Sequence, residues 1–304
     1  PGLRLRSSVT LVGKTQGGPR YASSLGVADR LISETPVAVV DLETTGLYPG
    51  GDRMVELAVV RVDPGNEPAL LLDTLINPRR AVSATEIHGI TDEDVADAPT
   101  FDQVAGNLVA ALRGCVFASY NVYFDAKFVQ AELSQVGVRA FPPHLCLMYM
   151  RPMLGIGAKC TLGDACRSHG VTHQSADRAA DDALASAQLW RRYAPTLAER
   201  GLRTFADLAR QRAYKFTKSF NAEPLGEDVC TRLPVGTRVK PRRSVDSTAP
   251  LHQRLDQRAV ALGEYWDALM SVLADLEVTQ AEVRYVAEKR QSLAIVEDDI
   301  RWLH

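Results

Sequence analysis

The pattern of apolar and polar residues predicts that the fold begins with strands. Residues 37–40 are apolar and mostly β-branched; they run into two acids, and the run ends at Gly46, which is typical of a buried strand. Turns containing Pro and Gly separate it from two further apolar segments, residues 54–62 and 70–76. Because connections this short join antiparallel neighbours, we expect three antiparallel strands at the start of the sheet.

From residue 100 onwards, helical and strand patterns alternate. Val104, Leu108 and Leu112 recur at the four-residue spacing of one helix face. The predicted helices cover residues 100–113, 124–136, 161–169 and 179–192, and the predicted strands between them cover residues 115–119 and 145–149. This order indicates the α/β class, with a mixed sheet flanked by helices.

The pattern changes again after residue 195. Residues 202–220 are predicted to form a basic helix, and residues 221–250 contain four prolines, typical of an extended linker or a small irregular module. A heptad seam then runs through Leu255, Ala259, Leu262, Trp266, Leu269, Leu273 and Leu276. Thr279 and Glu282 fit a capping box for a second helix. A helical hairpin packed on its own domain and a dimerising coiled coil both satisfy this pattern.

Composition and charge describe a globular chain with uneven electrostatics. Of 304 residues, 46% are hydrophobic and the net charge is −2. Residues 200–243 nevertheless carry eleven Lys and Arg against four acids, whereas residues 251–304 carry ten acids against six Lys and Arg. The basic segment interleaves Tyr214, Phe216 and Phe220 with lysines, which suits contact with a nucleic-acid backbone and stacking on its bases. A solvated basic helix is the alternative.

No targeting or membrane signal stands out. No apolar run approaches the ~18 residues of a membrane span, and the N-terminus lacks a secretion-signal pattern, so a cytoplasmic protein without a membrane partner is expected. The five cysteines are widely spread and do not indicate a disulfide framework. A zinc site is a further alternative, built from Cys160, Cys166, His169 and His173.

Acids occur where predicted elements end or begin. Asp41 and Glu43 end the first strand two residues apart, so their side chains share a face. Asp125 follows another apolar segment, and Asp182 lies in a run of helix-forming composition. Neighbouring carboxylates are costly unless neutralised, and hard divalent cations are their usual partner. A solvated strand end with incidental acids is the alternative for the first pair.

These acids carry a resemblance to a known family. Their motifs, D-x-E, N-x-x-F-D and a final Asp, resemble in order and spacing those of the DEDD superfamily of 3′-5′ exonucleases. Residues 86–93 are similar to the I-H-G-I-T-D segment of the DEDDh branch, which contains the proofreading epsilon subunit of bacterial DNA polymerase III. The match covers residues 36–194 and implies a ribonuclease H-like fold. The predicted parts are a tail (1–35), an exonuclease domain (36–195), a basic helix with a Pro-containing linker (196–250), and a helical hairpin or coiled coil (251–304).

The resemblance implies roles for the four acids. Phosphodiester hydrolysis would use two divalent cations, Mg²⁺ or Mn²⁺, about 4 Å apart. Asp41 would bridge them, Glu43 and Asp182 would bind the ion next to the attacking water, and Asp125 would bind the second ion, through water. The resemblance also implies substrate-binding residues, namely Thr44, Thr45, Gly46, Leu47, His88, Asn121 and Phe124. Core packing is the alternative for Phe124, and a hydrogen-bonded turn histidine is the alternative for His88.

One position departs from the family pattern. The branch carries a His five residues before the last Asp, and this chain has Asp177 there. Asp177 is read as a carboxylate base, as an added metal ligand or as a residue that disables the site; an engineered substitution is a fourth explanation. His173 lies four residues upstream and reaches the site only if the intervening loop bends back.

The sequence thus predicts a metal-dependent 3′-5′ exonuclease, slowed by the missing imidazole because general-base catalysis is worth about 10²–10⁴-fold. The alternative is a catalytically impaired, nucleic-acid-binding module on the same fold. Thr44 stands where oligoribonucleases usually have Met, so single-stranded DNA is preferred to RNA as the partner. Residues 251–304 are the expected contact for a second copy or another protein.

Overall fold

The computed structural model describes residues 26–173, 178–230, 233–236, 238–242, 257–273 and 280–297. Within this part of the chain, a five-stranded mixed sheet is the centre of the fold, with strand order β3-β2-β1-β4-β5. The strands are β1 (Val37–Thr44), β2 (Met54–Val62), β3 (Ala69–Leu75), β4 (Val116–Ser119) and β5 (His144–Cys146). β1, β2 and β3 pair antiparallel, and β4 and β5 continue the sheet in parallel with β1. The predicted ribonuclease H-like fold is confirmed.

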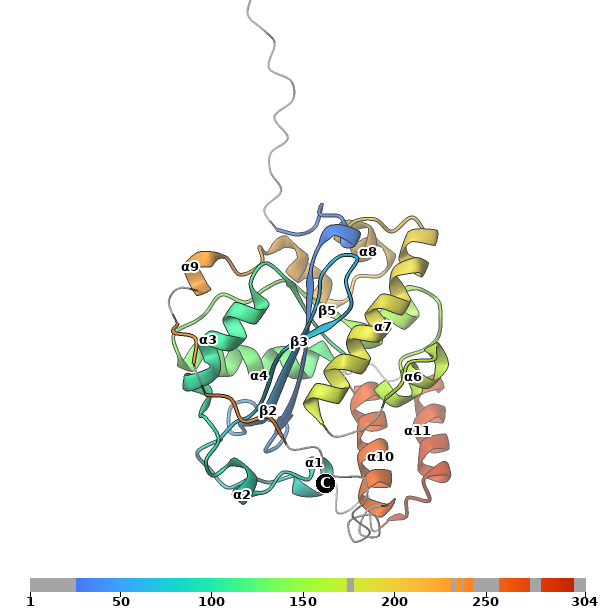
Figure 1. Cartoon of the computed structure of the whole chain (residues 1–304). Coiled ribbons are helices and arrows are strands. Elements are labelled where there is room, and N and C mark those ends of the chain that lie inside the picture. Colours follow the sequence, from blue (N-terminus) through green and yellow to red (C-terminus); the bar gives the residue numbers. More distant parts are fainter. Residues whose placement is uncertain are drawn as a thin grey trace, which may run out of the picture.

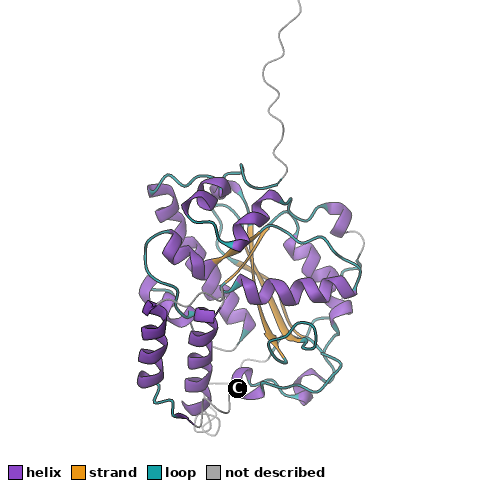
Figure 2. Cartoon of the chain, turned by 180° about the vertical axis from the view of Figure 1, so that it is seen from behind, coloured by secondary structure: helices purple, strands orange, loops and turns teal. Residues whose placement is uncertain are grey.

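Helices cover both faces of this sheet. Figure 1 shows α3 (Phe101–Leu112) and α4 (Val122–Gln135) on one side and α7 (Ala179–Glu199) on the other, and Figure 2 shows the same layers from behind. The shorter elements are η1 (Ile32–Glu34), α1 (Thr85–His88), α2 (Asp92–Val95), α5 (Leu147–Met153), α6 (Leu162–His169), α8 (Phe205–Gln211), η2 (Lys215–Asn221) and α9 (Glu227–Cys230). The C-terminal region is helical as predicted, with α10 (Gln257–Leu273) and α11 (Gln280–Ser292).

The central strand β1 is buried on both faces at its start and partly open at its end. Its first four side chains, Val37 to Val40, have no exposed surface, and burying each valine contributes about 1.5–3 kcal/mol. Asp41 and Glu43 are half-buried, whereas Leu42 between them is 5% exposed. The register with β2 shifts between Glu43 and Thr44. Such a bulge bends a strand and re-aims its side chains, as is common next to active sites.

The predicted strand over residues 145–149 is wrong in its second half. β5 pairs with β4 over only three residues, and helix α5 begins at Leu147. Leu, Met and Tyr at residues 147–150 are all apolar, and a short buried helix cannot be told from a buried strand by such a run. The Met148 N–H donates to the Tyr120 carbonyl at 2.9 Å, which ties the start of α5 to the end of β4.

The single basic helix predicted over residues 202–220 is also wrong. α8 ends at Gln211, and the following 3-10 turn η2 places its aromatic rings in the core. Phe216 and Phe220 are each 1% exposed, and Tyr214 meets Tyr149 edge-on with ring centroids 4.4 Å apart. These rings are therefore occupied by core packing, and the prediction that they stack on bases is wrong.

Residues 233–236 and 238–242 run along the domain as a strap. The main chain of Lys240 bonds to β3: its carbonyl accepts from Leu75 N at 2.7 Å, and its N–H donates to the Thr74 hydroxyl at 3.0 Å. Further back, a Cβ on Gly106 of α3 would lie 2.0 Å from the Pro234 carbonyl oxygen. Only glycine therefore allows the strap to lie this close to α3.

The C-terminal helices pack together and onto their own chain. Figure 1 shows α10 and α11 side by side next to α6, with α10 beside α1. The most buried side chains of α10 are Tyr265, Ala268 and Val272, which are offset from the predicted heptad seam. Since one face of the pair covers the domain, the hairpin form of the prediction accounts for the described contacts. Association with a second copy or another protein through residues 251–304 stays a prediction.

Candidate active site

The four predicted acids line one cavity. Asp41 and Glu43 from β1, Asp125 from α4 and Asp182 from α7 all border a pocket of about 330 Å³, a volume within the usual range of ligand sites. Three segments far apart in the sequence thus meet at the carboxyl end of β1. Carboxylate convergence of this kind is the geometry that the D-x-E and later acidic motifs predict.

Two helix starts deliver the distant acids. Asn121 is the N-cap of α4, and Asp125 lies in the first turn of that helix. Asp182 likewise lies in the first turn of α7. Negative side chains are favoured in the first turn because the helix dipole and the free N–H groups present positive charge there. Each helix therefore partly offsets the charge that its own acid brings to the cavity.

The remaining repulsion appears in the titration of these groups. Burial, and then the charges of Asp182, Asp125 and Glu43, raise the pKa of Asp41 well above its usual value. Burial also raises the pKa of Asp125 to about 7. The pKa of Asp182 is raised by burial too, although its bond to His173 opposes the shift. The cavity thus holds more negative charge than the protein itself neutralises.

Replacing Asp125 with asparagine is expected to stabilise the metal-free protein at pH 8. Asp125 is 5% exposed, and between its unfolded pKa near 4 and its folded pKa of about 7 the folded state binds a proton that the unfolded state has lost. The unfolding free energy of the wild type therefore falls as the pH rises through that window, by at most about 4 kcal/mol at 1.4 kcal/mol per pKa unit. Thermal unfolding in EDTA should show a higher Tm for D125N, with a smaller gain at pH 5.

The exposed Asp29 provides the matched control, because D29N removes a surface carboxylate that does not line the cavity. A D125N variant that is less stable than wild type at pH 8 would show that the Asp125 carboxylate is already compensated within the protein.

The donor set fits hard divalent cations. All four acids offer oxygen, the preferred ligand of Mg²⁺ and Mn²⁺, and the Asn121 side-chain oxygen is buried without a hydrogen-bond partner among the described residues. In the same part of the chain, no three His, Cys, Asp or Glu side chains lie in ligating geometry as they stand.

His173 reaches the site, which the sequence left open. Its Nε2 lies 2.5 Å from an oxygen of Asp182, and both side chains are largely buried. The loop after α6 thus bends back and brings an imidazole to the last acid. No local pattern signals this contact, because it depends on the path of the chain between Gly170 and α7.

Asp177, predicted at the general-base position, lies outside the described residues. Its role stays a prediction.

The residues of the zinc alternative have different partners. His169 bonds Arg151, the Tyr120 hydroxyl donates to the Cys160 carbonyl, and His173 bonds Asp182.

Most of the predicted substrate-binding residues border the cavity. The pocket lining includes Thr44, Gly46, Leu47, His88, Asn121 and Phe124. Thr45 is not part of this lining; its hydroxyl donates to Asp52 at 3.2 Å and accepts from the Arg53 N–H at 3.1 Å. A Cβ on Gly46 would lie 2.6 Å from the Asp52 carboxylate, so a larger residue there would displace the Asp52 side chain.

His88 has the bonding of a structural turn histidine although it lines the cavity. The ring is 2% exposed, and its Nδ1 accepts from the Ile90 N–H at 3.1 Å. Nε2 therefore carries the proton and donates to the Ser83 carbonyl at 3.1 Å. Both ring nitrogens are used in holding the α1 turn, so His88 contributes surface to the cavity.

An ion pair beneath the site escaped sequence reasoning. Glu56 is fully buried opposite Glu43 in the register of β1 and β2, and Arg242 from the strap lies 3.5 Å from it. Arg242 also donates to the His88 carbonyl at 2.7 Å. The strap thus brings a positive charge under the acid cluster and fixes the α1 turn. Arg242 lies in a segment predicted as linker, so no sequence signal marked it.

The C-terminal helix supplies another unpredicted part of the cavity. Trp266, Asp267 and Met270 of α10 line the same pocket as the four acids. The heptad analysis assigned Trp266 to a helix-pairing seam. Its place in the pocket depends on the docking of α10, which sequence spacing does not reveal.

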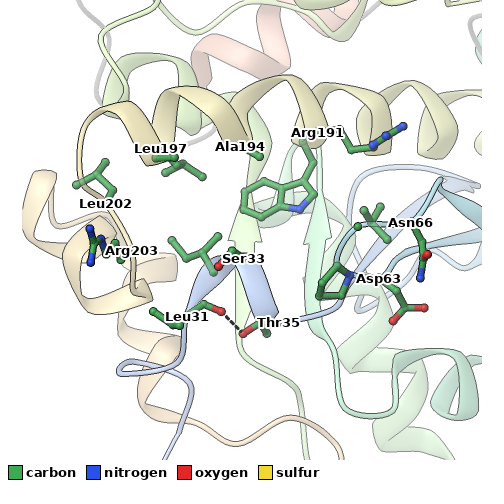
Figure 3. A pocket seen from close by; sticks show the side chains of 16 residues that line it. Leu31, Ser33, Thr35, Asp63, Asn66, Arg191, Ala194, Leu197, Leu202 and Arg203 are labelled. Carbon is green, nitrogen blue, oxygen red and sulfur yellow. Dashed lines mark hydrogen bonds between the residues drawn. The ribbon is translucent and has the colours of Figure 1, made fainter.

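A larger cavity lies elsewhere in the fold. Figure 3 shows this space of about 590 Å³ between η1 and the C-terminal half of α7, with Leu31, Ala194 and Leu202 among its lining. Its lining contains none of the predicted site residues. Size alone therefore does not identify the site, and we choose the smaller pocket because the four acids converge there.

Among the described helices, none is both long and apolar enough to cross a membrane.

Comparisons with known proteins agree on the class of domain. The family model RNase_T, described as an exonuclease, matches residues 38–190. A DNA polymerase III subunit epsilon-like protein of Rhodobacter capsulatus is 33% identical over 186 residues, which are 57% of this chain and 26% of that protein. The DNA polymerase III subunit epsilon of Treponema pallidum is 30% identical over 156 residues, 49% of this chain and 72% of that protein.

The chain spans 26%, 8% and 13% of the first three curated relatives. Among solved structures, Exonuclease X in complex with 5′ overhanging duplex DNA matches with a TM-score of 0.41 and 20% identity, covering 64% of this chain and 99% of that one. E. coli Exonuclease I with a dT13 oligonucleotide matches with a TM-score of 0.45 and 17% identity, covering 55% and 42%.

Proposed function

The chain belongs to the RNase_T exonuclease family, and from that premise we propose that it is a metal-dependent exonuclease that removes nucleotides from the 3′ end of single-stranded DNA. The observation that carries the proposal is the convergence of Asp41, Glu43, Asp125 and Asp182, from three separate segments, in one cavity. Four acids that converge in one cavity have a clear use in binding divalent ions at a phosphodiester.

Exonucleases of this family use divalent metal ions. In this chain Asp41 would be a ligand of both ions. Glu43 and Asp182 would be further ligands of one ion, and Asp125 would be a ligand of the other. When bound, such ions lower the pKa of water and stabilise the departing 3′ oxygen. The raised pKa values of Asp41, Asp125 and Asp182 mean that ion binding displaces protons, so affinity should rise with pH.

His173 is proposed as the group that takes the proton of the attacking water. Its Nε2 is held by Asp182 at 2.5 Å. With Asp182 bound to a cation instead, Nε2 would be freed, and in the Nδ1–H tautomer it would accept the proton of a water at that ion. His173 would then provide the imidazole that the family pattern has at the position of Asp177. We therefore expect near-normal rather than weak hydrolysis.

The surroundings of the acids support a single strand as substrate. The turn at Gly46 and Leu47 borders one side of the cavity, and α10 borders another. We propose that the 3′ end enters between them as a single strand. The curated relatives are named as DNA polymerase III subunits, which supports DNA over RNA.

The test is hydrolysis of a 5′-labelled oligonucleotide, as DNA and as RNA, with Mg²⁺ or Mn²⁺ and with EDTA. We expect a ladder that shortens from the 3′ end of the DNA, depends on the metal and disappears in EDTA. Metal-dependent binding without a ladder would overturn the proposal and favour the binding module, for which Asp177 at the usual His position is the motivating observation. Release of internal fragments would exclude an exonuclease.

A further inference from the structure

The C-terminal helices are fixed to the domain beside the cavity. Lys159 and Glu282 form an ion pair at 2.7 Å, and both side chains are only 9% exposed. The Tyr285 hydroxyl donates to Asp164 at 2.8 Å and accepts from the Thr161 N–H at 3.0 Å. Buried and hydrogen-bonded pairs such as these depend on their geometry much more than surface ion pairs do. They dock α11 onto the start of α6, which itself borders the cavity.

α10 presents different faces to its two surroundings. Tyr265, Ala268 and Val272 are buried, at the spacing of one helix face. Trp266 and Met270 are four residues apart on a neighbouring face, are only partly buried and line the cavity together with the acids. The docking of the helix pair thus leaves one aromatic and one thioether side chain directed at the site.

The chemistry of the cavity is divided between these walls. The acids, with bound cations, suit the charged phosphodiester, whereas Trp266 and Met270 offer polarisable apolar surface. A nucleotide has the same division, with a charged phosphate at one end and a flat base at the other. An aromatic ring binds any base by stacking, because every base has a π-face.

We propose that Trp266 on α10 stacks on the base of the 3′-terminal nucleotide and positions that nucleotide while its phosphodiester lies at Asp41, Glu43, Asp125 and Asp182. The inference rests on the proposed exonuclease function. It assigns to residues 257–273 a part in substrate binding that neither the family motifs nor the heptad pattern contains.

The test compares Trp266→Ala on two DNA oligonucleotides that differ only at the 3′ terminus, where one has a normal base and the other an abasic residue. On the normal substrate, W266A should lower kcat/KM by about 5- to 150-fold, the range for loss of one stacked base, mainly through KM. On the abasic substrate the loss should shrink to within about twofold. Trp266→Phe keeps a ring and should recover most of the rate.

Val283→Ala is the matched control, because Val283 lies on α11 and is 51% exposed, away from the cavity lining. An equal loss for W266A on both substrates would show that Trp266 only supports the fold and would overturn the inference. Fluorescence anisotropy with the same two oligonucleotides provides a readout that needs no hydrolysis. A wild type that binds but never cleaves would reject the proposed function, and the base-dependent effect of W266A on binding would still decide the role of Trp266.

Discussion

Asp41→Asn is expected to lower the hydrolysis rate about 10³-fold or more without unfolding the protein. Asp41 interacts electrostatically with all three other acids of the cavity. A carboxylate shared by two cations loses charge and one ligand atom for each when it becomes an amide. Metal ions contribute several kcal/mol to the stabilisation of the transition state, and about 4 kcal/mol corresponds to 10³-fold.

The measurement is the single-turnover rate on the 5′-labelled DNA at saturating Mg²⁺. Asp73→Asn is the matched control: it makes the same change in β3, where the pKa of Asp73 is raised by burial, and Asp73 does not line the cavity. D73N should keep the wild-type rate within about twofold. D41N should keep or raise the Tm in EDTA, because it removes a buried charge. Hydrolysis by D41N at more than a tenth of the wild-type rate would mean that the site lies elsewhere.

The four acids could be predicted as one site because their motifs resemble those of a known exonuclease family, while local rules predict the element on which each acid lies. Asp41 and Glu43 share a face through the two-residue period of a strand, and Asp125 and Asp182 follow from helix starts at the expected spacing. The sheet could be predicted for the same reason, since β1 and β2 are long apolar runs with short turns between them. Each of these inferences uses only neighbouring residues.

What could not be predicted depends on where segments dock. Phe216 and Phe220 have the composition of a base-stacking segment. Only the packing of Phe216 against Tyr149, and of Phe220 against Phe216, shows that their rings are core. Arg242 meets Glu56 across 186 residues of chain. Residue identity defines what a side chain can contact, while tertiary packing decides which contact it makes.

The walls of the cavity come from two parts of the chain. One wall carries the four acids of the family motifs, and another is formed by Trp266, Asp267 and Met270 of a helix that lies outside residues 38–190. Substitutions in the first wall should act on the chemical step, whereas those in the second should act on the substrate that reaches it. This separation can be measured as effects on kcat and on KM.

His173→Ala is expected to lower kcat about 10²–10⁴-fold, the usual value of general-base catalysis. His173 is the imidazole that contacts the acid cluster in the described part of the chain, through Asp182 at 2.5 Å. His173→Gln can still donate a hydrogen bond to Asp182 but cannot accept a proton from water at neutral pH. H173Q should therefore keep metal affinity near that of the wild type while losing kcat like H173A.

Asp177→Asn separates the two candidates for the base. If His173 takes the proton, D177N should retain kcat within about threefold, whereas H173Q should lose it. A large loss in D177N with full activity in H173Q would instead assign the proton to the Asp177 carboxylate. His144→Ala is the control for removing an imidazole, because His144 lies in β5 and bonds the Pro142 carbonyl, outside the cavity lining. The family position of the His holds Asp177, and His173 contacts Asp182, the last candidate metal ligand. D177N and H173Q together therefore decide whether the imidazole was lost or is supplied from four residues upstream.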